Sequence, residues 1–194
     1  MANFVSIFRI FIMFFAVYLI YCFEGNTTAY MWALILTILA FSLDGLDGYL
    51  ARKFHEESKF GALLDIMGDR IVENTYWILF AVMGWLNILF PLIAVTRGFV
   101  TDTIRSAAME KGFTPFGMQT NPICKFITGS KLMRISYAVA KVAAFVLIVA
   151  AKIPVCPNRE IIWEIGYWAA VFAIVFCVIR AIPVVIEAKR VIEE

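Results

Sequence analysis

Long apolar stretches make up most of this chain, and short polar stretches separate them. A membrane-spanning helix needs about 20 mainly apolar residues. Six stretches come close to that length, namely residues 4–23, 29–50, 60–83, 85–106, 131–151 and 161–186. The pattern therefore predicts an all-α integral membrane protein, a bundle of about six transmembrane helices. The polar stretches are too short for a soluble domain, so residues 1–194 are expected to form a single transmembrane domain.

The composition leads to the same class of protein. Of the 194 residues, 62% are hydrophobic and only 16% are charged, and the mean hydropathy is +0.85. A soluble domain carries about 25% charged residues. Membrane lipid is therefore an expected partner. The formal net charge of +2 is explained by the basic residues at the membrane surface, and no nucleic-acid partner is expected.

The distribution of basic residues predicts the orientation in the membrane. With six spans both termini lie on the same side, and most lysines and arginines of the connections fall on that side. The positive-inside rule places this side in the cytoplasm of a cell inner or plasma membrane. The opposite connections carry Lys152 and Arg159, whereas the cytoplasmic set is Arg52, Lys53, Lys59, Arg105, Lys111, Lys125, Lys131, Lys189 and Arg190.

Four aspartates at helical spacing stand out between residues 44 and 69. Asp44 and Asp47 are three positions apart, and Asp65 and Asp69 are four apart, so each pair shares one face of a helix. Two such faces turned toward each other would form a cage of oxygen ligands, which suits Mg²⁺ or Mn²⁺ better than zinc. The alternative is that these acids form salt bridges with basic residues at the membrane surface. Because intramembrane acids are costly, the pattern favours a metal site, and that site faces the cytoplasm.

The acidic segment also resembles a known family signature. Written out, it is Asp44-x2-Asp47-Gly48-x2-Ala51-Arg52-x8-Gly61-x3-Asp65-x3-Asp69. At every fixed position it is similar to the motif of the CDP-alcohol phosphotransferase (CDP-alcohol phosphatidyltransferase) family of membrane enzymes. The resemblance implies a homodimer that transfers a phosphatidyl-type group from a CDP-linked lipid, such as CDP-diacylglycerol, to an alcohol with release of CMP. It assigns Asp44, Asp47 and Asp65 to metal binding, and Asp69 to the metal site and to deprotonation of the acceptor hydroxyl.

The chemistry of these residues fits that reaction. Displacing a nucleotide from phosphorus requires neutralising a pyrophosphate and holding the attacking and leaving oxygens in line, which two metal ions about 4 Å apart can share. Gly48 and Ala51 lie one helical turn apart and leave a slot for the cytosine base, while Arg52 presents a planar fork of donors to a phosphate. Gly61 lets a neighbouring helix approach closely. Ordinary close packing of membrane helices is the alternative explanation for these small residues.

Other residues resemble the branch of the family that makes phosphatidylglycerophosphate. They include Ser6-x2-Arg9, which we assign to binding of the CDP-lipid. A further set of cations, whose alternative role is to anchor helices at the cytoplasmic face, is expected to bind the phosphate of a phosphorylated alcohol. This set comprises Arg97, Arg105, Lys131 and Arg134.

The residue at position 70 leaves the identity of the acceptor open. Arg70 follows Asp69 where that branch has a lysine, as in relatives that use inositol phosphate. Glycerol 3-phosphate is the expected acceptor, with inositol phosphate or another headgroup as the alternative. An alternative from another class is a divalent-cation transporter, but a transporter has no use for Arg52 and the small-residue slot.

Two isolated charges lie within the apolar stretches, and we interpret them as structural. Lys141 and Glu164 can each extend toward the membrane surface, or they can pair with each other across the last two spans.

Overall fold

The computed structural model describes residues 2–53, 59–111 and 121–193. Within these ranges, the side chains of residues 2–4, 44–53, 59–60, 62 and 189–193 are not described. The described part of the chain is mostly helical and contains no strand. The expected all-α fold is therefore confirmed.

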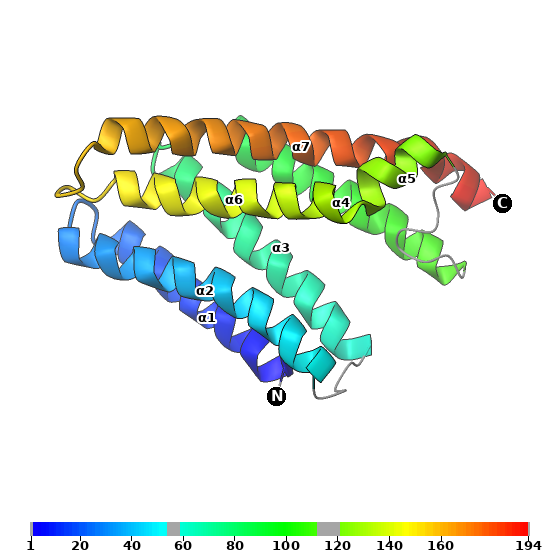
Figure 1. Cartoon of the computed structure of the whole chain (residues 1–194), viewed down its shortest axis with the longest axis horizontal. Coiled ribbons are helices and arrows are strands. Elements are labelled where there is room, and N and C mark those ends of the chain that lie inside the picture. The colour runs from blue at the N-terminus through cyan, green and yellow to red at the C-terminus, as the bar shows by residue number, and fades with distance from the viewer. Residues whose placement is uncertain (1, 54–58, 112–120, 194) are drawn as a thin grey trace.

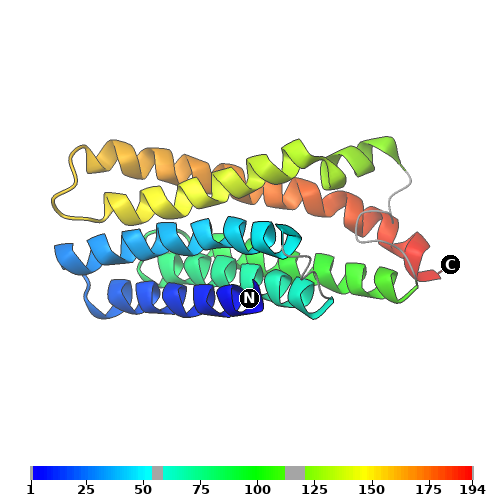
Figure 2. The same ribbon diagram turned by 60° about the horizontal axis from the view of Figure 1, so that its bottom comes forward.

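The described residues form six long helices and one short helix. They are α1 (Ala2–Cys22), α2 (Thr27–Lys53), α3 (Lys59–Val82), α4 (Leu89–Glu110), α5 (Pro122–Gly129), α6 (Lys131–Ala151) and α7 (Arg159–Glu193). α1 packs against α2 and α3, while α6 packs against α7. Figure 1 shows α6 and α7 side by side along one edge, with α3 crossing the bundle toward them. Figure 2 shows α1 and α2 as a second layer facing α6.

The surface and the helix lengths agree with an integral membrane protein. Three segments of the described chain are long and apolar enough to cross a membrane, namely Val5–Cys22, Pro122–Ala151 and Arg159–Ala188. α2 contributes the shorter apolar segment Thr27–Leu43. Large apolar side chains point outward, as Phe11 and Phe99 do with exposed fractions of 66% and 71%. Such a surface is stable when lipid covers it.

Two local features differ from the sequence-based expectation, and the first is the beginning of the fourth span. The fourth span was expected to begin at Trp85, but α4 begins at Leu89. Gly84, with φ +67°, follows the end of α3, and the side chain of Asn87 accepts a hydrogen bond from the Leu89 amide at 2.9 Å. A left-handed glycine is a common helix terminator, and an asparagine oxygen commonly satisfies the first amides of a helix.

The second difference is an extra helix in the long connection before α6. The polar stretch before the fifth expected span, residues 107–130, contains α5. Pro122 occupies the first turn of α5, and the side chain of Asn121 accepts a hydrogen bond from the Ile123 amide at 3.0 Å. A capping asparagine followed by proline is a favoured helix start, so the local sequence explains this element.

An aromatic core holds the C-terminal half of α3 in place. The rings of Tyr76 and Trp77 pack on Phe145 of α6, with centroids 5.1 and 4.7 Å apart, respectively. The Tyr76 and Thr37 hydroxyls share a hydrogen bond of 2.6 Å, which links α3 to α2. The N-terminal half of α3, with Asp65 and Asp69, therefore projects from a rigid anchor.

α6 and α7 approach each other closely at a glycine. A Cβ atom added at Gly166 would lie 3.2 Å from the backbone nitrogen of Ile148 and 3.1 Å from Cβ of Leu147. Small residues at such contacts let membrane helices pack backbone to backbone. This contact fixes α7 against α6 and, with it, the side chains at the other end of the pair.

Candidate active site

The two described acids of the motif lie on one face of α3, as their spacing predicts. The side chains of Asp65 and Asp69 are 51% and 47% exposed. Both approach the same atom of α1, since Nη2 of Arg9 lies 3.8 Å from Oδ1 of Asp65 and 3.2 Å from Oδ1 of Asp69. The two carboxylates therefore converge, and water can reach both of them.

Arg9 is a buried cation beside these acids, with only 2% of it exposed. Ser6, one turn earlier on the same face of α1, is buried as well. A Cβ atom at Gly68 would lie 2.8 Å from Nη2 of Arg9, closer than side chains tolerate. Glycine at position 68 thus makes the room in which the guanidinium reaches Asp69.

The other half of the motif lies at the end of α2. Asp44, Asp47, Gly48, Ala51 and Arg52 belong to the last turns of this helix, and their side chains lie outside the described residues. Gly61 lies in the first turn of α3. α1 packs against both α2 and α3, and the end of α2 and the beginning of α3 lie at the same end of the bundle (Figure 1). The meeting of the two acidic pairs stays a prediction.

The described acids fit a hard divalent cation. Asp65 and Asp69 offer carboxylate oxygens on one face, which is the donor type that Mg²⁺ and Mn²⁺ prefer. Arg9 pairs with Oδ1 of Asp69, and because about half of this side chain is exposed, the carboxylate is accessible to a metal or to a proton. Two carboxylates are fewer than a metal site of this kind needs, and the pair on α2 is the expected complement.

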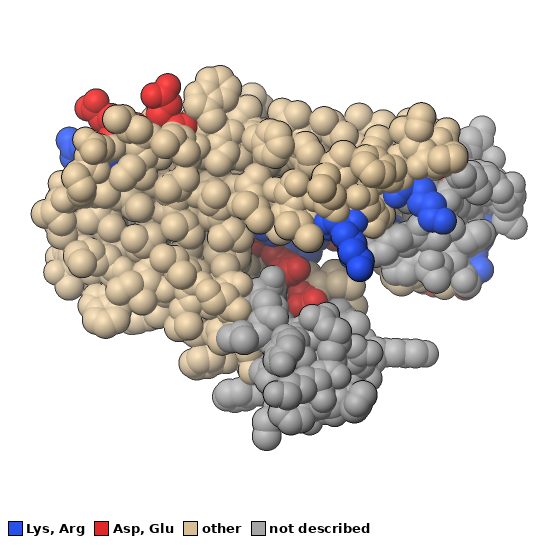
Figure 3. Space-filling view, viewed as in Figure 1, with Lys and Arg blue, Asp and Glu red and all other residues tan. Residues whose placement is uncertain are grey.

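A cluster of cations lies beside the acidic face. Arg97 and Arg105 of α4 and Arg180 of α7 are close enough to repel one another. Figure 3 shows basic and acidic side chains meeting in a hollow below α6. Nε of Arg97 donates to the Cys177 carbonyl at 3.2 Å, and Nη2 of Arg180 donates to the Thr128 carbonyl at 3.4 Å. Carbonyl partners hold these side chains without neutralising their charge, which favours an anionic ligand.

Sequence reasoning did not include Arg180 among the candidate site residues. Its guanidinium lies 5.6 Å from the centroid of the Tyr137 ring, and the residue is 8% exposed. The two cations expected from α6 are in the first turn of that helix, where Lys131 and Arg134 are exposed. Arg134 is near enough to Arg180 to repel it, so Arg134 belongs to the cluster.

Arg70 has a specific partner on α4. Its Nε and Nη2 atoms donate to Oδ2 and Oδ1 of Asp102 at 2.7 and 2.9 Å. A lysine cannot make this two-point contact, because it lacks the planar fork. The arginine after Asp69 is therefore explained by Asp102, and it gives no independent indication of the acceptor.

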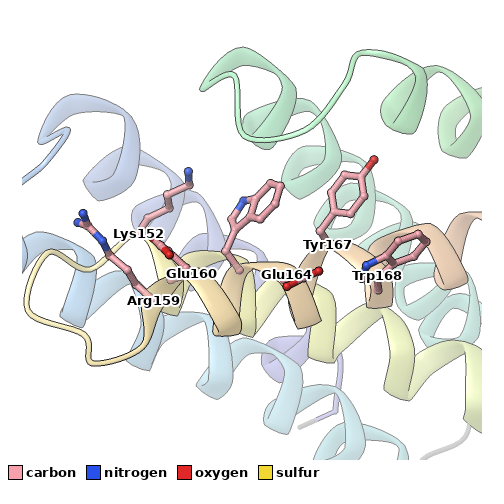
Figure 4. A pocket seen from close by; sticks show the side chains of 8 residues that line it. Lys152, Arg159, Glu160, Glu164, Tyr167 and Trp168 are labelled. Carbon is pink, nitrogen blue, oxygen red and sulfur yellow. The ribbon is translucent and has the colours of Figure 1, made fainter.

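A pocket of about 690 Å³ lies at the opposite end of the bundle, next to the α6–α7 connection (Figure 4). Burial and the nearby charge of Arg159 lower the pKa of Lys152, whose Nζ lies 5.5 Å from the centroid of the Trp85 ring. Aromatic rings mixed with charges are typical of a membrane–water interface, and this pocket is remote from the acids. Its lining is Ala151, Lys152, Arg159, Glu160, Trp163, Glu164, Tyr167 and Trp168.

Comparison with known proteins agrees with this geometry. The model of the family described as CDP-alcohol phosphatidyltransferase matches residues 1–182. The chain belongs to the CDP-alcohol phosphatidyltransferase family. The family consists of membrane enzymes that generally depend on a divalent metal, which favours the transferase interpretation over a cation transporter.

Several similar members of the CDP-alcohol phosphatidyltransferase family share one name. A CDP-diacylglycerol--glycerol-3-phosphate 3-phosphatidyltransferase of Mycoplasma pneumoniae is 38% identical over 40% of this chain and 34% of its own length. A protein of the same name from Rickettsia typhi is 25% identical over 88% of both chains. A CDP-diacylglycerol--inositol 3-phosphatidyltransferase of Candida albicans is 38% identical over 27% of this chain and 20% of its own length. The match with the Mycoplasma relative thus spans about a third of that protein.

Proposed function

We propose that this protein transfers the phosphatidyl group of CDP-diacylglycerol to glycerol 3-phosphate, which yields phosphatidylglycerophosphate and CMP. The observation that carries the proposal is the meeting of acidic and cationic side chains in one hollow. The acids proposed to act there are Asp65 and Asp69 of α3, and the proposed cations include Arg97 of α4 and Arg180 of α7. A reaction between a metal-bound diphosphate and a phosphorylated alcohol needs both.

The acids are proposed to hold one or two divalent ions, Mg²⁺ or Mn²⁺. Asp44 and Asp47 of α2 would face Asp65 and Asp69 of α3, so that four carboxylates surround the ions. When bound, these ions neutralise charge on the diphosphate of the CDP-lipid. The convergence of Asp65 and Asp69 on a single atom of Arg9 supports this, because it shows carboxylates held close together despite their repulsion.

Asp69 is proposed as the catalytic base. The acceptor hydroxyl oxygen forms a bond to the lipid-side phosphorus, and the bond from that phosphorus to the bridging oxygen breaks. CMP leaves with the electron pair, while the hydroxyl proton moves to Asp69 and then to water. The ion pair with Arg9 supports this role because it holds a carboxylate that is about half exposed, so that Asp69 can accept the proton.

The CDP-lipid is proposed to bind at the junction of α1, α2 and α3. Ser6 and Arg9 line this junction from α1, and both are buried there. Gly48, Ala51 and Arg52 of α2 would contact the cytosine and a phosphate, while Gly61 of α3 would allow close approach of the helices. The long apolar surface of the helices supports a lipid substrate with its tails in the membrane.

The acceptor phosphate is proposed to bind the cation cluster. Arg97, Arg105 and Arg180 repel one another, so a dianionic phosphate between them relieves repulsion and gains charged hydrogen bonds. Lys131 and Arg134 at the beginning of α6 would add to the attraction. A neutral alcohol would leave this repulsion in place, and we expect it to be a poor substrate.

Two observations favour glycerol 3-phosphate over inositol phosphate as the acceptor. Relatives from Mycoplasma and Rickettsia carry glycerol 3-phosphate in their names, and the Rickettsia relative matches 88% of this chain. The Asp-Arg ending at position 70, which pointed to inositol phosphate, is accounted for by the contact of Arg70 with Asp102. Inositol phosphate remains the alternative acceptor.

The proposed enzyme is a homodimer with one transmembrane catalytic domain per chain and its active site at the cytoplasmic face. The beginning of α1, the end of α2 and the end of α7 lie toward the same end of the bundle (Figure 1), as six spans require. The lysines and arginines of the connections concentrate at that end. The positive-inside rule supports the cytoplasmic orientation.

The proposal is tested by measuring CMP release from CDP-diacylglycerol with a panel of acceptors. Purified protein in detergent with Mg²⁺ or Mn²⁺ is supplied with glycerol 3-phosphate, inositol phosphate, glycerol, inositol or serine. We expect the fastest release with glycerol 3-phosphate. Equal rates with glycerol and glycerol 3-phosphate would contradict the phosphate pocket, and no release with any acceptor would contradict the transferase reaction.

A further inference from the structure

A buried carboxylate lies one turn beyond Asp69 on α3. Glu73 is only 4% exposed, because this part of α3 packs inside the bundle. Its Oε1 atom accepts a hydrogen bond from the Tyr137 hydroxyl, and its Oε2 atom accepts one from Nζ of Lys141 at 3.1 Å. Both donors belong to α6, so Glu73 ties α3 to that helix. The Lys141–Glu164 pair considered from the sequence is therefore wrong, because Lys141 pairs with Glu73.

The carboxylate of Glu73 also approaches Arg70, which is the partner of Asp102. Nη1 of Arg70 lies 3.9 Å from Oε2 of Glu73, while the other face of the guanidinium holds Asp102 of α4. The ring of Tyr137 in turn lies under Arg180 of α7. Glu73 thus stands at the centre of a polar network that joins α3 to α4, α6 and α7.

The four residues that form ion pairs in this network are balanced in charge. Glu73 and Asp102 carry two negative charges, and Arg70 and Lys141 carry two positive charges. Burying a carboxylate among membrane helices is costly unless it is paired, so such residues are retained for a purpose. A balanced network has little attraction for a further ion. Its purpose is therefore better sought in the geometry that it fixes than in binding a substrate.

We propose that Glu73 is a positioning residue for the transfer step, an inference that rests on the proposed function. The base Asp69 lies on α3, whereas the cations proposed to hold the acceptor phosphate lie on α4, α6 and α7. Glu73, one turn from Asp69, bonds directly to α6, and its neighbours Arg70 and Tyr137 make the contacts with α4 and α7. It therefore sets the distance between the base and the hydroxyl of an acceptor whose phosphate is held on the other side of the hollow.

This distance matters because the acceptor is small. Its phosphate and its reacting hydroxyl are separated by a few bonds, so the acceptor cannot compensate for a shift of α3 against the cations. A misplacement of about 1 Å can lower the rate of a transfer about 100-fold. The effect should fall on the transfer step more than on binding of the CDP-lipid, since Glu73 ties α3 to α6, whereas that lipid is proposed to bind where α3 meets α1 and α2.

The first test compares Glu73→Gln with Glu164→Gln. Glu164 is an exposed glutamate of α7 at the opposite end of the bundle, so it is a matched control. We expect Glu73→Gln to lower kcat for the best acceptor about 10- to 100-fold while the KM for CDP-diacylglycerol stays within about twofold. An unchanged kcat in a folded Glu73→Gln protein would overturn the proposal.

A second variant separates positioning from charge balance. Glu73→Gln combined with Lys141→Met leaves Arg70 and Asp102 balanced, so thermal stability should return toward that of the parent while kcat stays low. If kcat recovered together with stability, Glu73 would only balance charge. If both variants failed to fold, Glu73 would only stabilise the protein. Either result would overturn the proposal. A parent protein that releases no CMP with any acceptor would instead contradict the proposed function and, with it, this inference.

Discussion

Nη2 of Arg9 on α1 lies 3.2 Å from Oδ1 of Asp69 on α3, and this contact connects the N-terminal helix to the proposed base. Arg9 is almost completely buried, whereas the side chain of Asp69 is about half exposed. A buried cation that forms an ion pair with one oxygen of an accessible carboxylate restrains the orientation of that carboxylate. The contact thereby gives the first helix a role in the reaction besides spanning the membrane.

The role of this contact can be tested through the glycine beneath it. Gly68→Ala would place a Cβ atom 2.8 Å from Nη2 of Arg9 and displace the guanidinium from Asp69. We expect kcat to fall about 10-fold or more, because a base out of position transfers protons poorly. Gly129→Ala is the control, since a Cβ atom there meets nothing within 4 Å. Equal CMP release by the two variants would show that Arg9 does not position Asp69.

Removing the metal should abolish activity. Excess EDTA is expected to stop CMP release, and added Mg²⁺ or Mn²⁺ to restore it. Asp65→Asn keeps the shape of the side chain but removes the charge that a hard cation needs, so this variant should require a higher metal concentration for half-maximal rate. Undiminished turnover in EDTA, or an identical metal titration for Asp65→Asn, would contradict the metal site.

Asp69→Asn should affect turnover more than binding. A proton acceptor acts in the transition state, while the CDP-lipid is held mainly by the other residues of the site. We therefore expect a large fall in kcat and a small change in the KM for CDP-diacylglycerol. If the variant lost affinity for the CDP-lipid and kept its maximal rate, Asp69 would have only a ligating role.

The cation cluster predicts a selective change in acceptor affinity. Arg97→Ala and Arg180→Ala each remove charged hydrogen bonds to the phosphate, worth roughly 1.5 to 3 kcal/mol each. The KM for glycerol 3-phosphate should rise about 10- to 100-fold, with little change in that for CDP-diacylglycerol. Arg159→Ala, an exposed arginine at the opposite end of the bundle, is the control. Unchanged acceptor kinetics in both cluster variants would remove the phosphate pocket.

The apolar pattern predicted much of this fold. The stretch 131–151 coincides with α6, and the spacing of Asp65 and Asp69 placed both on one face, because a helix repeats every 3.6 residues. The motif of residues 44–69 likewise predicted the family, and the comparison with known proteins confirmed it. Periodicity along one helix is a local property, and it can be read from the sequence directly.

Contacts between helices could not be predicted in this way. Glu73 pairs with Lys141, which is 68 residues away, and Arg70 pairs with Asp102 on another helix. The register and crossing of helices decide such pairs, and the apolar pattern carries little information on either. Arg180 was missed for the same reason, since only the packing of α7 brings it to the other arginines. The start of α5 at Pro122 was a local signal that could have been found.

The proposed reaction is tested most directly by following the acceptor into the lipid. Purified protein is incubated with CDP-diacylglycerol, Mg²⁺ and glycerol 3-phosphate labelled with ¹³C, and the lipids are analysed by mass spectrometry while CMP is measured in the water phase. We predict a labelled phosphatidylglycerophosphate formed in equal amount to CMP, and none with Asp69→Asn. Lipids without label, in protein that binds CDP-diacylglycerol, would contradict transfer to glycerol 3-phosphate.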